Sequence, residues 1–181
     1  MLHHKLINPK NIAVIGASNN VQTPGGRVLK NLIDHNFKGE LFAVNPKETE
    51  VQGVKCFQNI KNIPSVDVAI IAIAAKFTLE TIKILVKEKN TKGFIIFSAG
   101  FSEKDAEGAI LEKQITELIS NSGGSLLGPN NIGLIKPVRA FINDGVYRAS
   151  VVASTPTKYV PRLFGNISEL FKTKKENSRL G

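Results

Sequence analysis

The sequence predicts an α/β fold, a Rossmann-like parallel sheet with helices on both faces, in a single domain followed by a C-terminal extension. Three observations lead to this prediction. Short apolar runs alternate with longer segments in which apolar residues recur at helical spacing. Two of the runs, Asp67–Ile73 and Gly93–Ser98, are almost wholly apolar, as parallel strands covered on both faces are. The first run ends in Gly16, directly before a turn and a helix, which is the order of a βαβ unit.

The first half of the predicted sheet is read from local patterns. We predict a strand at Asn11–Gly16, a helix at Gly25–His35 and a second strand at Glu40–Asn45, stopped by Pro46. The apolar face of the helix comprises Val28, Leu29, Leu32 and Ile33.

The second half follows the same alternation. After the strand at Asp67–Ile73 we predict a helix, with Thr78 as its cap. After the strand at Gly93–Ser98, Ser102 and Asp105 resemble a capping box that opens a long helix. The apolar faces of these two helices comprise Leu79, Ile82, Leu85 and Val86 in the first, and Leu111, Ile115, Leu118 and Ile119 in the second. A last short strand is predicted at Ser125–Leu127.

The α/β pattern fades after Pro137, so we place one domain at residues 1–137 and an extension at 138–181. The extension is basic, with eight Lys or Arg against three Asp or Glu. Residues Phe141–Val152 fit either an irregular segment or a strand, and Pro161–Lys172 could form an amphipathic helix. That helix could pack on its own domain, associate with a second copy or bind a partner.

Composition limits the classes of partner. No apolar run approaches the roughly 18 residues of a membrane span, and the N-terminus has no hydrophobic signal region. Cys56 is the single cysteine, so no intrachain disulfide can form, and we predict a cytoplasmic location. The net charge of +9 would suit nucleic acid or a phosphorylated ligand, or simply a solvated surface. Because zinc-finger spacing and aromatic RNA-binding motifs are absent from the sequence, we predict neither a nucleic-acid nor a membrane partner.

Ligands of open α/β sheets bind beyond the carboxyl ends of the strands, so the residues there are the candidate site. After the first strand, Gly16 and the four residues that follow could receive a phosphate on backbone amides at a helix N-terminus, or could form a plain tight turn. The GxGxxG fingerprint is absent. The second strand ends in neutral Asn45, where NAD-binding domains usually place an acid, and Lys47 follows. This favours a phosphorylated ribose, as in coenzyme A or NADP, unless Lys47 is a solvated surface lysine. The later strand ends add Ala75 and Lys76, then Phe97, Ser98 and Ala99, and finally Asn130.

Seven segments at these strand ends, in their order along the chain, resemble the CoA-binding domain of the NDP-forming acyl-CoA synthetases. That superfamily includes ADP-forming acetate–CoA ligase and the alpha subunit of succinyl-CoA synthetase. The segments are NPKNIAVIGAS (8–18), GGRVLKNL (25–32), FAVNPK (42–47), VQGVKCF (51–57), AKF (75–77), FSAGFSE (97–103) and GPNNIG (128–133). The resemblance implies that CoA contacts Ala17, Ser18, Asn19, Asn20, Lys47, Phe97, Ser98, Ala99 and Asn130. We add Gly16, Ala75 and Lys76 as candidate binding residues.

This sequence departs from the family pattern in ways that bear on function. The family usually has cysteine where this chain has Asn131, and often proline where it has Ala74, so CoA affinity could be altered. In the family, a second domain that contains a phosphorylated histidine follows, whereas here the family pattern stops near Pro137, and none of His3, His4 and His35 lies in a matching motif. We therefore predict no catalytic residue and no metal site in this chain, and expect the chain alone to lack phosphoryl-transfer activity.

The predicted function is that of a CoA-binding module, either free-standing or one piece of a synthetase whose other domains lie on a partner chain. The predicted ligand is coenzyme A or an acyl-CoA, and the partner could be a synthetase chain or a second copy. The alternative is an NADP-binding Rossmann domain of an oxidoreductase or a redox-sensing regulator. Lys47 permits that alternative, while the missing GxGxxG disfavours it.

Overall fold

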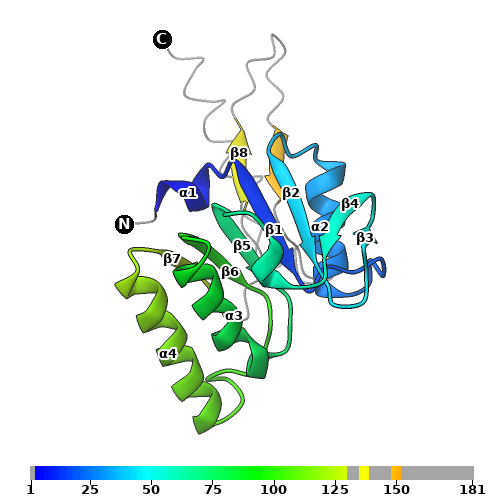
Figure 1. The fold of residues 1–181 in the computed structure, drawn as a ribbon. Helices are drawn as coiled ribbons and strands as arrows, with labels where there is room; N and C mark the ends of the chain where they lie inside the picture. Colours follow the sequence, from blue (N-terminus) through cyan, green and yellow to red (C-terminus); the bar gives the residue numbers. More distant parts are fainter. Residues whose placement is uncertain (1–2, 130–134, 139–147, 152–181) are drawn as a thin grey trace, which may run out of the picture.

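A seven-stranded sheet, in the order β3-β4-β2-β1-β5-β6-β7, is the centre of the computed structural model (Figure 1). The structure describes residues 3–129, 135–138 and 148–151. The strands of this sheet are β1 (Asn11–Ile15), β2 (Glu40–Val44), β3 (Glu50–Val51), β4 (Val54–Phe57), β5 (Val68–Ile71), β6 (Gly93–Ile96) and β7 (Ser125–Leu127). All neighbouring pairs are parallel except β3 with β4. The prediction of a Rossmann-like parallel sheet is therefore confirmed.

The strand order identifies where a ligand would enter the sheet. The chain begins at β1, moves outward to β2 and β4, and then returns to place β5 on the other side of β1. The order therefore reverses between β1 and β5, and the crevice at such a reversal is where open α/β sheets bind ligands. In the register, Ile15 at the end of β1 lies between Val44 of β2 and Ile71 of β5.

Helices cover both faces of the sheet, as predicted. The helices are α1 (His4–Ile7), α2 (Pro24–Asp34), α3 (Ala75–Lys87) and α4 (Ala106–Asn121), with a 3-10 turn at Ile60–Asn62. Because side chains of a strand alternate between faces, β1 contributes Ile12 and Val14 to one core cluster and Ala13 and Ile15 to the other.

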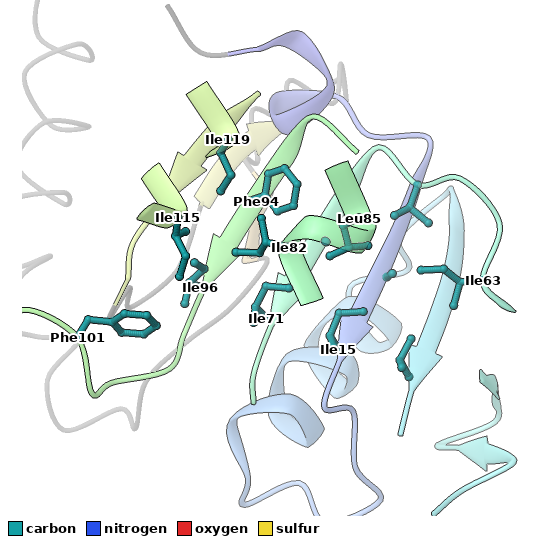
Figure 2. Close-up of a cluster of buried hydrophobic side chains, with 14 residues drawn as sticks. Ile15, Ile63, Ile71, Ile82, Leu85, Phe94, Ile96, Phe101, Ile115 and Ile119 are labelled. Atoms are coloured by element: carbon teal, nitrogen blue, oxygen red, sulfur yellow. The ribbon is translucent and has the colours of Figure 1, made fainter. Parts of the chain in front are cut away.

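The two clusters divide the helices between the faces. The first cluster contains Val28, Leu29 and Leu32 of α2 together with Leu6 of α1. The second contains Ile82 and Leu85 of α3 with Ile115 and Ile119 of α4. Figure 2 shows these α3 and α4 side chains directed toward Phe94, Ile71 and Ile96 of the sheet.

Two of the predicted helix starts are wrong. Ala74, not Thr78, is the cap residue of α3, and Thr78 lies inside the helix with its side chain buried and its hydroxyl donating to the Ala74 carbonyl. Ser102 is not part of a capping box either. The N-cap of α4 is Asp105 alone, whose carboxylate accepts a hydrogen bond of 2.7 Å from the Gly108 N–H. In both places a hydroxyl residue near a helix start resembles a cap in sequence, but burial or a better placed acceptor decides the outcome.

Several elements were not predicted. The short helix α1 and the hairpin β3–β4 both escape an analysis of periodicity because each spans too few residues to show a period. Strands β8 (Ile135–Val138) and β9 (Arg148–Val151) form a separate antiparallel pair. β9 lies within the segment 141–152, whose sequence fits either a strand or irregular structure, while the predicted helix at 161–172 is outside the described residues. The boundary at residue 137 falls within β8 and stays a prediction.

None of the helices in the described ranges is long and apolar enough to cross a membrane.

Asp67, directly before β5, binds the N-terminal segment through an ion pair and a hydrogen bond. Its carboxylate contacts the Lys5 ammonium at 2.9 Å and accepts a 2.9 Å hydrogen bond from the Lys10 N–H. Burial alone would raise the pKa of this carboxyl, but the hydrogen bonds from Lys5 and Lys10 outweigh it, so the pKa lies below its ordinary value. The charged carboxylate therefore stabilises the folded chain.

Replacing Asp67 with asparagine is expected to lower the free energy of unfolding by about 1 kcal/mol at pH 7, since the pair is partly exposed. Because the folded-state pKa is lowered, the contribution is complete above the ordinary aspartate pKa of about 4 and is lost as the pH falls through the folded-state pKa. Urea unfolding of both proteins between pH 3 and 7 measures this difference. Asp34→Asn, at an exposed pair with Lys30, should change little. A difference for Asp67→Asn that persists undiminished in acid would contradict the assignment.

Candidate functional site

The loop between β1 and α2, residues 16–23, lies at the point where the strand order reverses; we call it the first loop. Gly16 has a φ of +85°, and a Cβ placed there would lie 2.5 Å from the Ala72 carbonyl oxygen, so only glycine fits. At the start of α2, a Cβ on Gly25 would lie 1.9 Å from the Gly16 carbonyl oxygen. The absence of side chains at these two positions lets the helix N-terminus lie directly against the end of β1.

This close packing produces an arrangement suited to an anion. Thr23 caps α2 by accepting a 3.2 Å hydrogen bond from the Gly26 N–H, and Pro24 occupies the first helical position. Backbone N–H groups at the start of a helix have no partner inside the helix, and the helix dipole adds partial positive charge there. Within the part of the chain that the structure describes, the backbone N–H groups of Ala17, Ser18 and Asn19 form no hydrogen bond. Phosphate groups bind in such places.

Two carbonyl groups of the first loop, by contrast, accept hydrogen bonds from amide side chains of other segments. The Asn45 Nδ2 donates to the Ala17 carbonyl at 2.8 Å, and the Gln52 Nε2 donates to the Ser18 carbonyl at 2.7 Å. Asn19 is bound to the hairpin β3–β4: its Oδ1 accepts a 2.9 Å hydrogen bond from the Gln52 N–H. Contacts with the segments that follow β2 therefore hold residues 17–19, while hydrogen bonds within the loop, such as that from the Thr23 N–H to the Asn20 carbonyl, hold its second half.

A cavity of about 230 Å³ lies next to the first loop. It is lined by the start of α2 and by the residues that follow β5 and β6, namely Pro24, Ala72, Ile73, Ala74, Ser98 and Ala99. Most of these side chains are small and apolar, so the cavity suits a narrow, mainly apolar part of a ligand. Its position beside the loop would let one elongated ligand place an anionic group on the loop and a thinner portion in the cavity.

Side chains of the loop after β6 form hydrogen bonds with backbone groups of this loop and of the loop after β5. The Ser98 hydroxyl donates to the Ile73 carbonyl, which joins the two loops that line the cavity. The Glu103 carboxylate accepts hydrogen bonds from the N–H groups of Gly100, at 2.6 Å, and Phe101, at 3.2 Å. The hydrogen bond from Gly100 is the main cause that holds the pKa of Glu103 below its ordinary value. Gly100 itself has a φ of +103°, a conformation that favours glycine in the turn after β6.

The structure brings together most of the predicted site residues. Gly16, Ala17, Ser18, Asn19 and Asn20 form the first half of the first loop. Ser98 and Ala99 line the cavity, Ala75 starts α3 beside it, and Phe97 is half-buried with its ring packed against the α2 face of the core.

The two predicted lysines are exposed, and neither lines the cavity. The Lys47 N–H donates to the Asn45 side chain, while the Lys76 ammonium lies 4.9 Å from the centre of the Phe77 ring. Ala74, where the family often has proline, lines the cavity. Asn130 and Asn131 lie outside the described residues.

Sequence reasoning missed two residues that shape the first loop. From the sequence, Asn45 is notable only as a neutral residue where a ribose-binding acid is usual, and Gln52 does not stand out. The VQGV segment holds one signal that could have identified the turn, because glycine is common at the second position of a two-residue hairpin loop between apolar residues. That the side chain would reach the first loop could not be read from it.

The described residues offer no catalytic constellation at this site. His3 and His4 lie at α1 and His35 caps the end of α2, away from the cavity lining. Cys56 is buried, and burial raises the pKa of its thiol, which disfavours the reactive thiolate. Within the described ranges, no group of three His, Cys, Asp or Glu side chains is placed to hold a metal ion.

The sequence matches a family model described as a CoA binding domain over residues 10–137. The alpha subunit of ADP-forming acetate–CoA ligase II from Pyrococcus furiosus is 43% identical over 129 residues, which cover 71% of this chain and 28% of that subunit. ADP-forming acetate–CoA ligase II from Archaeoglobus fulgidus is 38% identical over 140 residues, covering 77% of this chain and 21% of that protein.

Solved structures of similar proteins match the same part of the chain. The crystal structure of PH0766 from Pyrococcus horikoshii OT3 has a TM-score of 0.65 and 43% identity, covering 71% of this chain and 29% of that one. The dinucleotide-forming acetyl-coenzyme A synthetase 1 of Ca. Korarchaeum cryptofilum, in complex with phosphate and ADP, has a TM-score of 0.65 and 32% identity. The match covers 72% of this chain and 28% of that one. The matched region thus spans 21 to 29% of the length of these four proteins.

Proposed function

The chain belongs to the family of CoA-binding domains, and from that premise we propose that it binds coenzyme A or an acyl-CoA at the carboxyl edge of its sheet. The observation that supports this most directly is that a candidate phosphate-binding loop and a mainly apolar cavity lie side by side at this edge. In the first loop, the backbone N–H groups of residues 17–19 have no hydrogen-bond partner among the described residues and lie close to the N-terminus of α2, and the adjoining cavity is mainly apolar. Coenzyme A likewise joins a phosphorylated nucleotide to a thin pantetheine arm.

The proposal gives each group of residues a part in binding. Phosphate oxygens of CoA accept hydrogen bonds from the backbone of residues 17–19 and from the start of α2. Lys47, exposed in the turn after β2, pairs with the 3′-phosphate. The pantetheine arm lies along the small side chains of Ala74, Ala75, Ser98 and Ala99. Neither a base nor a nucleophile is needed from this chain in that role.

In the cell the chain would serve as the CoA-binding module of an acyl-CoA synthetase-like system. The matched relatives are several times longer than the region they share with this chain. We propose that phosphoryl transfer belongs to domains or a partner chain with a phosphorylated histidine, and that the chain acts in the cytoplasm. Purified alone, it would bind CoA without forming acyl-CoA from acid and nucleotide.

The binding proposal is tested by calorimetric titration of the purified chain with CoA, dephospho-CoA, NADP and NAD. We expect CoA to bind in the micromolar range and dephospho-CoA, which lacks the 3′-phosphate, about tenfold more weakly, as for loss of one hydrogen bond between charged groups. Binding of NADP in place of CoA would overturn the proposal and favour an oxidoreductase or redox regulator. Binding of none of the four would also overturn it.

Lys47→Ala tests the assigned phosphate contact. The substitution should weaken CoA binding by about tenfold and leave dephospho-CoA binding unchanged, because the lost partner is the 3′-phosphate. Lys113→Ala, on the exposed surface of α4, removes the same charge far from the site and should change neither affinity. An equal loss for both ligands in Lys47→Ala would show that Lys47 does not contact the 3′-phosphate.

A further inference from the structure

The turn of the hairpin β3–β4 makes three hydrogen bonds to the first loop and the start of α2. The Gln52 Nε2 donates to the carbonyl oxygens of Ser18, at 2.7 Å, and Gly26, at 2.8 Å. The backbone N–H of Gln52 donates to the Asn19 side chain at 2.9 Å. One residue at the edge of the sheet thus connects the loop after β1 with the helix that follows it.

Gln52 adopts an unfavourable backbone conformation in making these contacts. Its φ is +53° and that of Gly53 is +79°, so the two residues form the turn with both φ angles positive. Turns of this kind favour asparagine, aspartate or glycine at the first position, because other side chains are strained there. A glutamine at this position is therefore poorly explained by the turn itself. Its additional methylene group, compared with asparagine, is what allows the amide to reach two carbonyls.

The direction of the hydrogen bonds decides what the first loop presents to a ligand. In a trans peptide unit the C=O and the N–H of the next residue point in opposite directions. Holding the Ser18 carbonyl toward the hairpin therefore turns the Asn19 N–H away from it. Asn45 has the same effect on the preceding unit, since it holds the Ala17 carbonyl and so directs the Ser18 N–H.

We propose that Gln52 is a positioning residue that orients the backbone N–H groups of the first loop toward the phosphates of the ligand. This inference rests on the proposed function, in which that loop binds CoA. Only a donor can fill the position, because both partners are carbonyl oxygens. The Gln52 Oε1 is buried without a hydrogen-bond partner among the described residues, which agrees with a side chain retained for its donor group. Gln52 itself does not touch the ligand.

The variant Gln52→Asn separates this role from a merely structural one. Asparagine suits the turn better than glutamine but is one methylene too short to reach both carbonyls. We expect the midpoint of thermal unfolding to stay equal or rise, while CoA affinity falls by about tenfold and amide hydrogen exchange of residues 17–20 becomes faster. Gln58→Asn, at an exposed position just after β4, is the matched control and should alter none of these quantities.

Gln52→Met is a second variant, which keeps the length of the side chain and removes the donors. It should show the same loss of affinity and of exchange protection even if Gln52→Asn fails to fold. Wild-type affinity and unchanged exchange in either folded variant would overturn the proposal. If the wild-type chain does not bind CoA, the proposed function fails on its own. The exchange of residues 17–20 then still decides the positioning role: faster exchange in the variants supports it, and unchanged exchange overturns it.

Discussion

Replacing Gly25 with alanine is expected to abolish measurable CoA binding and to lower the free energy of unfolding by about 2–3 kcal/mol. A Cβ at this position would lie 1.9 Å from the Gly16 carbonyl oxygen and 2.7 Å from the Gly16 carbonyl carbon. Both are backbone atoms at the end of β1, so they cannot rotate away as a side chain could. The N-terminus of α2 would have to move away from the first loop.

The sign of this effect is informative because alanine normally favours a helix. At an open helical position, Gly→Ala stabilises by up to about 1 kcal/mol. Here the steric overlap opposes that gain, and displacement of the α2 N-terminus separates the N–H groups that the proposed site needs together. It also moves Pro24, which lines the adjoining cavity. We therefore expect the loss of CoA affinity to exceed what the loss of stability alone would cause.

Urea unfolding and calorimetric titration with CoA measure the two effects separately. Gly123→Ala provides the control, since Gly123, between α4 and β7, has a φ of +74° and no atom within 4 Å of the position that a Cβ would occupy. It should cost about 1 kcal/mol through backbone strain and leave CoA affinity unchanged. A Gly25→Ala protein that binds CoA as tightly as the wild type would show that the close contact between helix and loop is not required.

The largest expected loss of stability follows from replacing Phe94 with alanine. Phe94 lies in β6 with no exposed surface, between Ala69 of β5 and Leu126 of β7 in the register. Figure 2 shows its ring directed into the cluster that includes Ile82 and Ile119. Removing a buried ring costs its transfer free energy and leaves a cavity, for which about 3–5 kcal/mol is typical. That is a large part of the total stability of about 5–15 kcal/mol expected for a small domain.

Thermal and urea unfolding of Phe94→Ala measure this loss, with Phe77→Ala as the matched control. The Phe77 side chain is 56% exposed on the first turn of α3, so its removal should change the free energy of unfolding by no more than about 0.5 kcal/mol. Similar losses for the two variants would mean that the core beneath α3 and α4 is not packed as the structure shows.

Much of the fold could be predicted from the sequence because burial on two faces leaves a periodic pattern. The apolar runs now seen as β1, β5 and β6 have the composition of strands covered on both sides, and the apolar faces assigned to the helices are the faces that contact the sheet. The resemblance of the strand-end segments to CoA-binding domains is confirmed by the match over residues 10–137. The individual binding residues stay predictions, and Asn130 lies outside the described residues.

What could not be predicted concerns short elements and contacts between distant segments. The helix α1 and the strands of the hairpin span too few residues to show a period. The cap of α3 depended on whether Thr78 faces solvent or the core, which is settled only when the helix packs.

Composition and periodicity by themselves determined the main parallel strands and the helical faces, because each depends on how a segment divides its residues between core and water. The place of the site, at the carboxyl edge of the sheet, stays a prediction from the fold class. The tertiary structure alone decided how the first half of the first loop, residues 17–19, is held. Gln52 reaches Ser18 and Gly26 across 34 and 26 positions of sequence, and Asn45 reaches Ala17 across 28. Such hydrogen bonds depend on which distant segments become neighbours in the folded chain, and a local pattern of residues does not contain that information.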